Sequence, residues 1–254
     1  MIFILRHGER ADNCGPEEFN KIECLHDPHL TEFGKIQAQA AGKTLQSFIQ
    51  ESYEKGYLET RNPQIVMVSS PFLRCIQTAS HILDTFEPKD IYQGSIFIDE
   101  GVSEYLGKEF YDKDPLDELY IRTRSKEDIR KYTKYNLVDG FLEFQIYSSK
   151  ATYPENHETF FRRVQEGYRN IVEHFNNNIN KDKTKVLVIL THGLGTKGML
   201  SCHLENQICR KTDYTCISQV RYNPLSKGNG TILRELYRDH LDLIDIKEKT
   251  VLVA

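Results

Sequence analysis

The sequence predicts an α/β fold, a three-layer sandwich in which helices flank a mostly parallel central sheet. Three short runs, at residues 2–5, 65–68 and 185–190, are apolar apart from Lys185 at the start of the third. Continuous apolar runs are typical of parallel strands that are covered on both faces. Amphipathic segments separate the runs, and this order favours right-handed crossovers that place helices against both faces of a sheet.

Three segments have helical periodicity and supply the covering layers. Thr31 is a candidate N-cap for a helix over residues 32–49, in which apolar side chains recur every three or four positions. Residues 71–83 start with Pro71, and proline is favoured in the first turn of a helix. Residues 158–175 form the longest periodic stretch.

Two segments interrupt this alternation. Residues 12–29 are rich in turn-forming residues and predict a loop over the C-terminal end of the first strand. Residues 105–157 are charged and tyrosine-rich, with no clean strand period. We therefore predict one domain over residues 1–254, with an inserted cap at about 105–157.

The C-terminal part predicts a hairpin and an exposed edge. Residues 215–222 and 231–237 alternate as strands, and Asn229-Gly230 between them is a turn signal. The apolar side chains within residues 241–254 are candidates for an edge strand or a subunit interface.

Composition limits the class of protein. Of 254 residues, 39% are hydrophobic and 28% charged, which is enough apolar content for a core and excludes wholesale disorder. The net charge of −4 is unfavourable for non-specific binding to nucleic acid. The six cysteines form no C-x-x-C pair, and no run approaches the ~20 apolar residues of a membrane helix. Charged residues follow too soon after the N-terminus for a signal peptide, so we expect a cytoplasmic protein without membrane or nucleic-acid partners.

Histidines and arginines follow the predicted strands at the point where each strand ends. Arg6-His7 comes directly after the first strand and His192 after the third, while Arg74 falls in the first turn of the helix after the second. Because ligands of open parallel sheets bind beyond the carboxyl ends of the strands, these side chains should meet at one edge. Two histidines with Arg6, Arg10 and Arg74 predict a pocket for an oxyanion such as phosphate.

These motifs resemble the histidine phosphatase superfamily, which has the phosphoglycerate mutase-like fold. The resemblance rests on R-H-G-E-R at residues 6–10, S-S-P-F-L-R-C-I-Q-T-A at 69–79 and T-H-G at 191–193. The motifs look most similar to the phosphatase domain of the suppressor-of-T-cell-receptor-signalling (Sts) proteins. H-D-P-H-L-T-E-F-G at residues 26–34 also resembles that branch.

The resemblance implies a phosphatase that needs neither a metal nor a cofactor. His7 would be the nucleophile and form a phosphohistidine, with Arg6, Arg10, Arg74 and His192 around the phosphoryl oxygens. Glu104 matches the position of the general acid, and Glu100 is the second candidate. The chain departs from the Sts pattern at Gly101, where that pattern has proline, and at Tyr105, where it has tryptophan. The implied substrates are phosphotyrosine in proteins or small aryl or sugar phosphates, and a homodimer is implied as well.

Several alternatives stay open. A phosphoglycerate mutase would continue R-H-G with a short polar residue and a Trp-Asn pair, whereas this chain continues with Glu9-Arg10. A non-catalytic module that binds a phosphorylated ligand is the second alternative. G-x-G-x-x-G at residues 193–198, with Asp213 beyond it, fits a dinucleotide-binding motif on paper, but too little chain follows to complete a nucleotide-binding half. His26 and His29 have a metal-like spacing without a companion cluster, and Cys75 lacks the C-x5-R loop of cysteine phosphatases.

Overall fold

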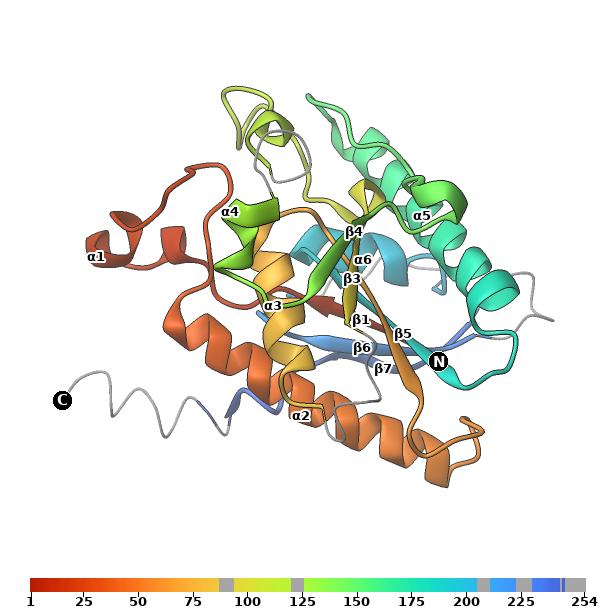
Figure 1. Cartoon of the computed structure of the whole chain (residues 1–254). Helices are drawn as coiled ribbons and strands as arrows, with labels where there is room; N and C mark the ends of the chain where they lie inside the picture. Colours follow the sequence, from red (N-terminus) through yellow and green to blue (C-terminus); the bar gives the residue numbers. More distant parts are fainter. Residues whose placement is uncertain (87–93, 120–125, 205–210, 223–229, 243, 245–254) are drawn as a thin grey trace.

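A single twisted sheet organises the molecule (Figure 1). The computed structural model describes the chain apart from residues 87–93, 120–125, 205–210, 223–229, 243 and 245–254. The sheet has seven strands in the order β4-β3-β2-β5-β1-β6-β7. These strands are β1 (Ile2–Arg6), β2 (Gln64–Ser69), β3 (Ser95–Ile98), β4 (Asn136–Asp139), β5 (Lys185–Thr191), β6 (Ile217–Arg221) and β7 (Thr231–Tyr237). The first five strands run parallel, and β6 and β7 add an antiparallel edge, which confirms the predicted mostly parallel sheet.

Helices cover both faces of this sheet, as predicted. The α-helices are α1 (Pro16–Phe19), α2 (Glu32–Glu54), α3 (Leu73–Leu83), α4 (Lys126–Arg130), α5 (His157–His174) and α6 (Gly193–Leu200). Short helical turns add η1 (Ala11–Asn13), η3 (Glu100–Val102), η4 (Pro115–Glu118), η5 (Glu143–Gln145) and η6 (Phe175–Ile179). One core cluster packs α2 and α3 against one face of the sheet, and a second packs α5 and α6 against the other. The alternating side chains of β1 show this division, because Phe3 and Leu5 belong to the first cluster and Ile2 and Ile4 to the second.

Helix starts agree with the sequence in two places and differ in a third. The hydroxyl of Thr31 accepts a hydrogen bond from the backbone N–H of Gly34 at 2.8 Å, which confirms it as the N-cap of α2. Asn156 caps α5 through a reciprocal pair of hydrogen bonds with Thr159. The helix predicted to start at Pro71 begins only at Leu73, because the carboxylate of Asp27 accepts the Leu73 N–H at 2.7 Å and holds the preceding residues extended.

The segment predicted as a cap contributes to the sheet. Within residues 105–157, Asn136–Asp139 forms β4, which pairs with β3 at the sheet edge. That part of the cap prediction is wrong, and β3 was not predicted either. Both strands have four residues in which buried side chains are mixed with partly exposed ones, so neither produces the continuous apolar run that identified β1, β2 and β5.

The loop after β1 is held in close backbone contact with the first turn of α2. A Cβ on Gly8 would lie 2.5 Å from the carbonyl oxygen of Gly34, and a Cβ on Gly34 would lie 2.3 Å from that of Glu9. Both positions therefore require glycine for space and not for a turn conformation. Two side chains add to this contact, since Thr78 accepts from the Gly8 N–H at 3.0 Å and Gln37 from the Glu9 N–H at 2.8 Å.

The C-terminal predictions are tested only in part. β6 and β7 pair as an antiparallel hairpin, as expected. The predicted turn and nearly all of residues 241–254, with the proposed interface, lie outside the described residues. Among the described helices, none is long and apolar enough to span a bilayer.

Candidate active site

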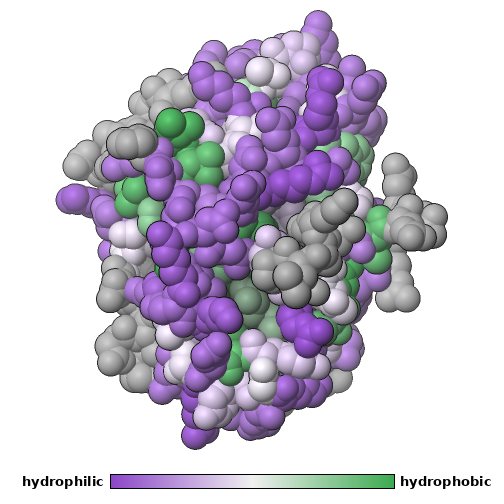
Figure 2. Space-filling model, turned by 90° about the vertical axis from the view of Figure 1, so that its right-hand side faces the viewer, coloured by the Kyte–Doolittle hydropathy of each residue, from purple (hydrophilic) through white to green (hydrophobic). Residues whose placement is uncertain are grey.

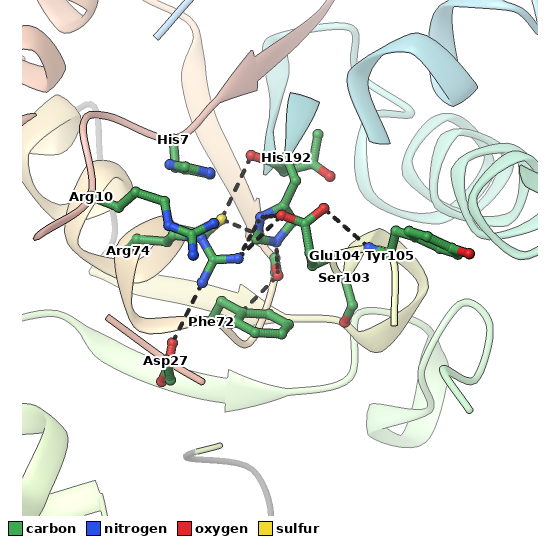
Figure 3. A network of polar contacts seen from close by, with 12 residues as sticks. His7, Arg10, Asp27, Phe72, Arg74, Ser103, Glu104, Tyr105 and His192 are labelled. Atoms are coloured by element: carbon green, nitrogen blue, oxygen red, sulfur yellow. Dashed lines mark hydrogen bonds and ion pairs between the residues drawn. The ribbon is translucent and has the colours of Figure 1, made fainter. Parts of the chain in front are cut away.

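The predicted site residues converge at the carboxyl ends of three neighbouring strands, as Figure 3 shows. Because β5 lies between β1 and β2, His7 after β1, His192 after β5 and Arg74 near the start of α3 face one point. Glu104 reaches the same point from the loop that follows η3. His7, Arg74 and His192 are almost completely buried, whereas the Glu104 side chain keeps 18% of its surface exposed.

The hydrogen bonding of His7 fixes its tautomer. Its Nδ1 lies 2.7 Å from the carbonyl oxygen of Gly8, which can only accept, so Nδ1 carries the proton and Nε2 keeps a free lone pair. Burial and the positive charge of Arg74 hold the pKa of His7 well below its ordinary value. The imidazole is therefore neutral at physiological pH, which is the state a nucleophile requires.

His192 links the strand end to Glu104. Its Nε2 lies 2.8 Å from the Ser70 hydroxyl, and its Nδ1 lies 3.1 Å from Oε2 of Glu104. Burial lowers the pKa of His192 to about 4. Because the carboxylate is ionised, a neutral His192 carries its proton on Nδ1 and donates it to Glu104, while Ser70 donates to Nε2.

Arg74 is a fully buried cation aimed at the same carboxylate. Its Nη2 lies 3.3 Å from Oε2 of Glu104, and its Nη1 lies 4.0 Å from Oδ1 of Asp27. The guanidinium carbon lies 4.4 Å from the centre of the Phe72 ring. Nε and Nη1 have no hydrogen-bond partner in the described part of the chain, so the guanidinium retains donor capacity for an anion.

Arg6 and Arg10 lie on two other sides of the site. Arg6 donates to the carbonyl oxygen of Thr212 at 2.5 Å and stacks over Tyr214 at 4.2 Å, and its buried Nε has no partner among the described residues. Arg10 pairs with Asp12 through two hydrogen bonds and remains partly exposed. Figure 3 places the Arg10 guanidinium beside that of Arg74.

Glu104 and Glu100 have different surroundings. Burial by itself would raise the pKa of Glu104, but its electrostatic interaction and hydrogen bond with His192 and the positive charge of Arg74 hold it well below its ordinary value. Glu100 instead accepts from the backbone N–H of Ala151 at 3.3 Å. The structure therefore brings Glu104, and not Glu100, to the two histidines.

A buried arginine that the sequence reasoning missed positions Glu104. Arg163 of α5 forms a salt bridge with Glu155, its Nε donating to Oε1 at 2.6 Å. Its other nitrogens donate to carbonyl oxygens along the 100–104 loop, including that of Glu104 at 2.9 Å. The sequence signal for such a buried, positioning residue was an arginine on the otherwise apolar face of a predicted helix.

A comparison with known protein families identifies the family of the chain. The profile of the histidine phosphatase superfamily (branch 1) matches residues 2–228. The chain belongs to the histidine phosphatase superfamily. No curated protein sequence matches it.

Solved structures share its fold at low sequence identity. The ecdysone phosphate phosphatase of Bombyx mori, in complex with tungstate, is 17% identical with a TM-score of 0.58, over 93% of each chain. A phosphoserine phosphatase of Entamoeba histolytica is 18% identical with a TM-score of 0.51, over 94% of this chain and 98% of that one. A mycobacterial glucosyl-3-phosphoglycerate phosphatase is 15% identical with a TM-score of 0.53, over 93% of this chain and 98% of that one. These similarities confirm the phosphoglycerate mutase-like fold. The finer likeness to Sts proteins rests on the sequence motifs alone.

Three side chains of the candidate site have the spacing of metal ligands. A ring nitrogen of His7, a ring nitrogen of His192 and a carboxylate oxygen of Glu104 lie within 4.8 Å of one another. A cation held there would face the guanidinium of Arg74, which already contacts the same carboxylate. The repulsion favours an anion over a metal ion at this position.

The remaining candidates from the sequence have structural roles. The glycines of G-x-G-x-x-G permit close packing, because a Cβ on Gly195 would lie 2.3 Å from the Thr191 hydroxyl. Burial raises the pKa of Cys75 to about 12, so its thiol is a poor nucleophile. His26 contacts Glu118 and Asp112 at 3.1 and 3.0 Å and ties its loop to the 105–157 segment.

A cavity opens beside Glu104. It has a volume of about 240 Å³ and a lining that is part apolar wall and part polar. That wall consists of Leu25, Tyr105, Phe110, Tyr111 and Leu194. Arg10, Asp12, His26 and Glu104 supply the polar part of the lining.

Proposed function

We propose that this member of the superfamily is a phosphomonoesterase that works through a phosphohistidine on His7 and needs no metal ion. One observation carries the proposal: a neutral, buried His7 with a free Nε2 faces Arg74, His192 and Glu104 at one end of the sheet. An unprotonated nucleophile, buried cationic donors and a carboxylate are the groups that phosphoryl transfer requires.

The carboxylate of Glu104 occupies the position of a phosphoryl oxygen. Its Oε2 accepts from both His192 and Arg74, the two donors that would hold the transferred group. A bound phosphate ester must displace this oxygen, and its own negative charge then raises the pKa of Glu104. Substrate binding thereby converts Glu104 from an ionised carboxylate into a candidate proton donor.

The reaction then has two balanced steps. In the first, the Nε2 lone pair of His7 attacks phosphorus, the ester P–O bond breaks, and the leaving oxygen takes a proton from Glu104. In the second, water attacks the phosphohistidine, the N–P bond breaks, and the carboxylate of Glu104 accepts the proton of the water. Inorganic phosphate leaves with Glu104 protonated again.

The cavity beside Glu104 supports an aromatic leaving group. Its apolar wall includes Tyr105, Phe110 and Tyr111, and aromatic side chains favour flat, apolar ligands. We therefore propose phosphotyrosine or another aryl phosphate as the substrate class, ahead of sugar phosphates.

Hydrolysis of p-nitrophenyl phosphate in EDTA tests the proposal. We expect the purified protein to release p-nitrophenol with EDTA present, at the rate measured without it. Hydrolysis that stops in EDTA and returns with a divalent cation would contradict the metal-free mechanism. Transfer of phosphate to a phosphoglycerate with little hydrolysis would instead indicate a mutase. Phosphate binding without any turnover would indicate a module that only binds its ligand.

Substitution of Glu104 by glutamine tests the proton donor. We expect E104Q to slow phenyl phosphate, which has a poor leaving group, by about 10²–10³ and p-nitrophenyl phosphate far less. Because the pKa of Glu104 is low and the pKa of His7 is lowered as well, the wild-type kcat/KM for phenyl phosphate should rise as pH falls below 7, and this rise should be absent in E104Q. Inhibition by phosphate should strengthen, because the competing carboxylate charge is removed. Equal slowing of both esters would argue against Glu104, and E100Q is the matched control.

A further inference from the structure

A second, larger cavity lies next to the aromatic one, between α5 and α6. It has a volume of about 760 Å³. Its lining consists of His157, Glu158, Phe161, Arg162, Gln165, Leu194, Lys197 and Ser201. None of these residues belongs to the phosphoryl-transfer machinery described above, and we call this cavity the α5/α6 groove.

The groove continues the cavity in which the leaving group is proposed to lie. Leu194 lines both of them. Tyr105, in the aromatic wall, stacks on His157 of the groove with ring centres 4.7 Å apart and an interplanar angle of 17°. A ligand that passes Leu194 therefore leaves the aromatic cavity and enters the groove.

The charges of the groove favour an anion. Lys197 of α6 is half-buried and Arg162 of α5 is exposed. Neither cation forms a salt bridge within the described ranges of the chain. Glu158 is the single acidic residue of the lining, so the groove has a surplus of positive charge although the whole chain has a net charge of −4.

The surroundings of the groove are suited to an extended ligand and not to a broad apolar docking partner. Figure 2 looks onto the side of the molecule that carries α5, where most of the visible surface is hydrophilic and hydrophobic atoms appear in separate patches. Phe161 and Leu194 are the aliphatic or aromatic members of the groove lining. The groove therefore combines a largely apolar floor with two cations that form no salt bridge among the described residues.

We infer that the α5/α6 groove binds an acidic residue that flanks the phosphotyrosine of a peptide substrate. This inference rests on the proposed function. The tyrosyl ring would fill the aromatic cavity, the peptide would cross Leu194, and a glutamate or aspartate side chain would lie between Arg162 and Lys197. These two residues determine specificity and take no part in bond breaking.

A pair of matched peptides tests this inference. One phosphotyrosyl peptide carries glutamates next to the phosphotyrosine, and the other carries glutamines at the same positions. We expect the wild-type kcat/KM to be about tenfold higher for the glutamate peptide, mainly through KM, and this preference to decrease as salt is added. In the variant with both R162Q and K197Q the two peptides should be hydrolysed equally well.

The control substitution lies on the same helix. Arg169 of α5 is exposed and does not line the groove, so R169Q should keep the wild-type preference. A wild-type ratio near one, or a preference that survives the double substitution, would overturn the inference. If the enzyme prefers a small carboxylated aryl phosphate tenfold over its uncarboxylated analogue but hydrolyses the two peptides equally well, the groove does not bind a peptide. p-Nitrophenyl phosphate, which carries no flanking acidic residue, separates the two proposals, because its hydrolysis by the wild type tests the phosphatase alone.

Discussion

Replacing His7 with alanine is expected to lower the kcat for p-nitrophenyl phosphate by about 10⁴ or more, because no other side chain of the site offers a neutral nucleophile with a free lone pair. His192 donates from Nδ1 to Glu104, its Nε2 is bonded to Ser70, and burial keeps Cys75 protonated. The fold should be retained, since the imidazole contributes a single hydrogen bond to the neighbouring Gly8 carbonyl. Circular dichroism and thermal unfolding of H7A check this point.

The intermediate itself can be observed. Wild-type protein quenched in alkali during turnover of a ³²P-labelled ester should retain label that is stable to base and lost in acid, and H7A should retain none. H29A is the matched control, because His29 lies outside the site, and it should label like the wild type. Label in H7A, or turnover by H7A near the wild-type rate, would disprove the assignment of the nucleophile.

Substitution of Arg74 should have the largest combined effect on stability and activity. R74M leaves the carboxylates of Asp27 and Glu104 without their shared buried cation, so we expect the free energy of unfolding to fall by about 3–5 kcal/mol. Loss of a buried donor to the phosphoryl group should lower kcat/KM by about 10²–10³. Urea unfolding and steady-state kinetics measure the two effects.

Two further variants separate stability from catalysis. R74K keeps the charge but loses the planar, multi-donor head, so it should recover much of the stability and little of the activity. R163M removes a different buried arginine, whose partners are Glu155 and the carbonyl oxygens of the Glu104 loop. It should be destabilised as strongly as R74M, yet keep phosphate binding, because Arg163 does not reach the anion site. Full activity in R74M would remove Arg74 from the mechanism.

The fold class could be predicted because its central strands have a local signature. β1, β2 and β5 are buried on both faces and are therefore apolar at nearly every position, which can be read without knowing their partners. β3 and β4 lie toward the edge, have four residues each and keep polar side chains, so their strand character depends on pairing with each other and with β2. Local patterns do not contain that information.

The same division applies to the site. His7 and His192 follow strands directly and Arg74 lies in the first turn of the helix after β2, so the chain itself delivers them to one sheet edge. By contrast, the loops after β3 that carry Glu100 and Glu104 have no local rule that decides which carboxylate turns inward. Arg163, 59 positions away from Glu104, fixes the loop by donating hydrogen bonds to its carbonyl oxygens.

The sequence by itself predicted the parallel sheet, its covering helices and the convergence of two histidines and three arginines, because each strand and helix is marked by residues close together in the chain and parallel strands end at one sheet edge. Only the tertiary structure decided the tautomer of His7, the low pKa of Glu104, the contacts of its carboxylate with His192 and Arg74, and the groove beyond Leu194. All of these arise from burial and from contacts between residues far apart in sequence, which change the free energy of a charge or a proton only once the chain has folded.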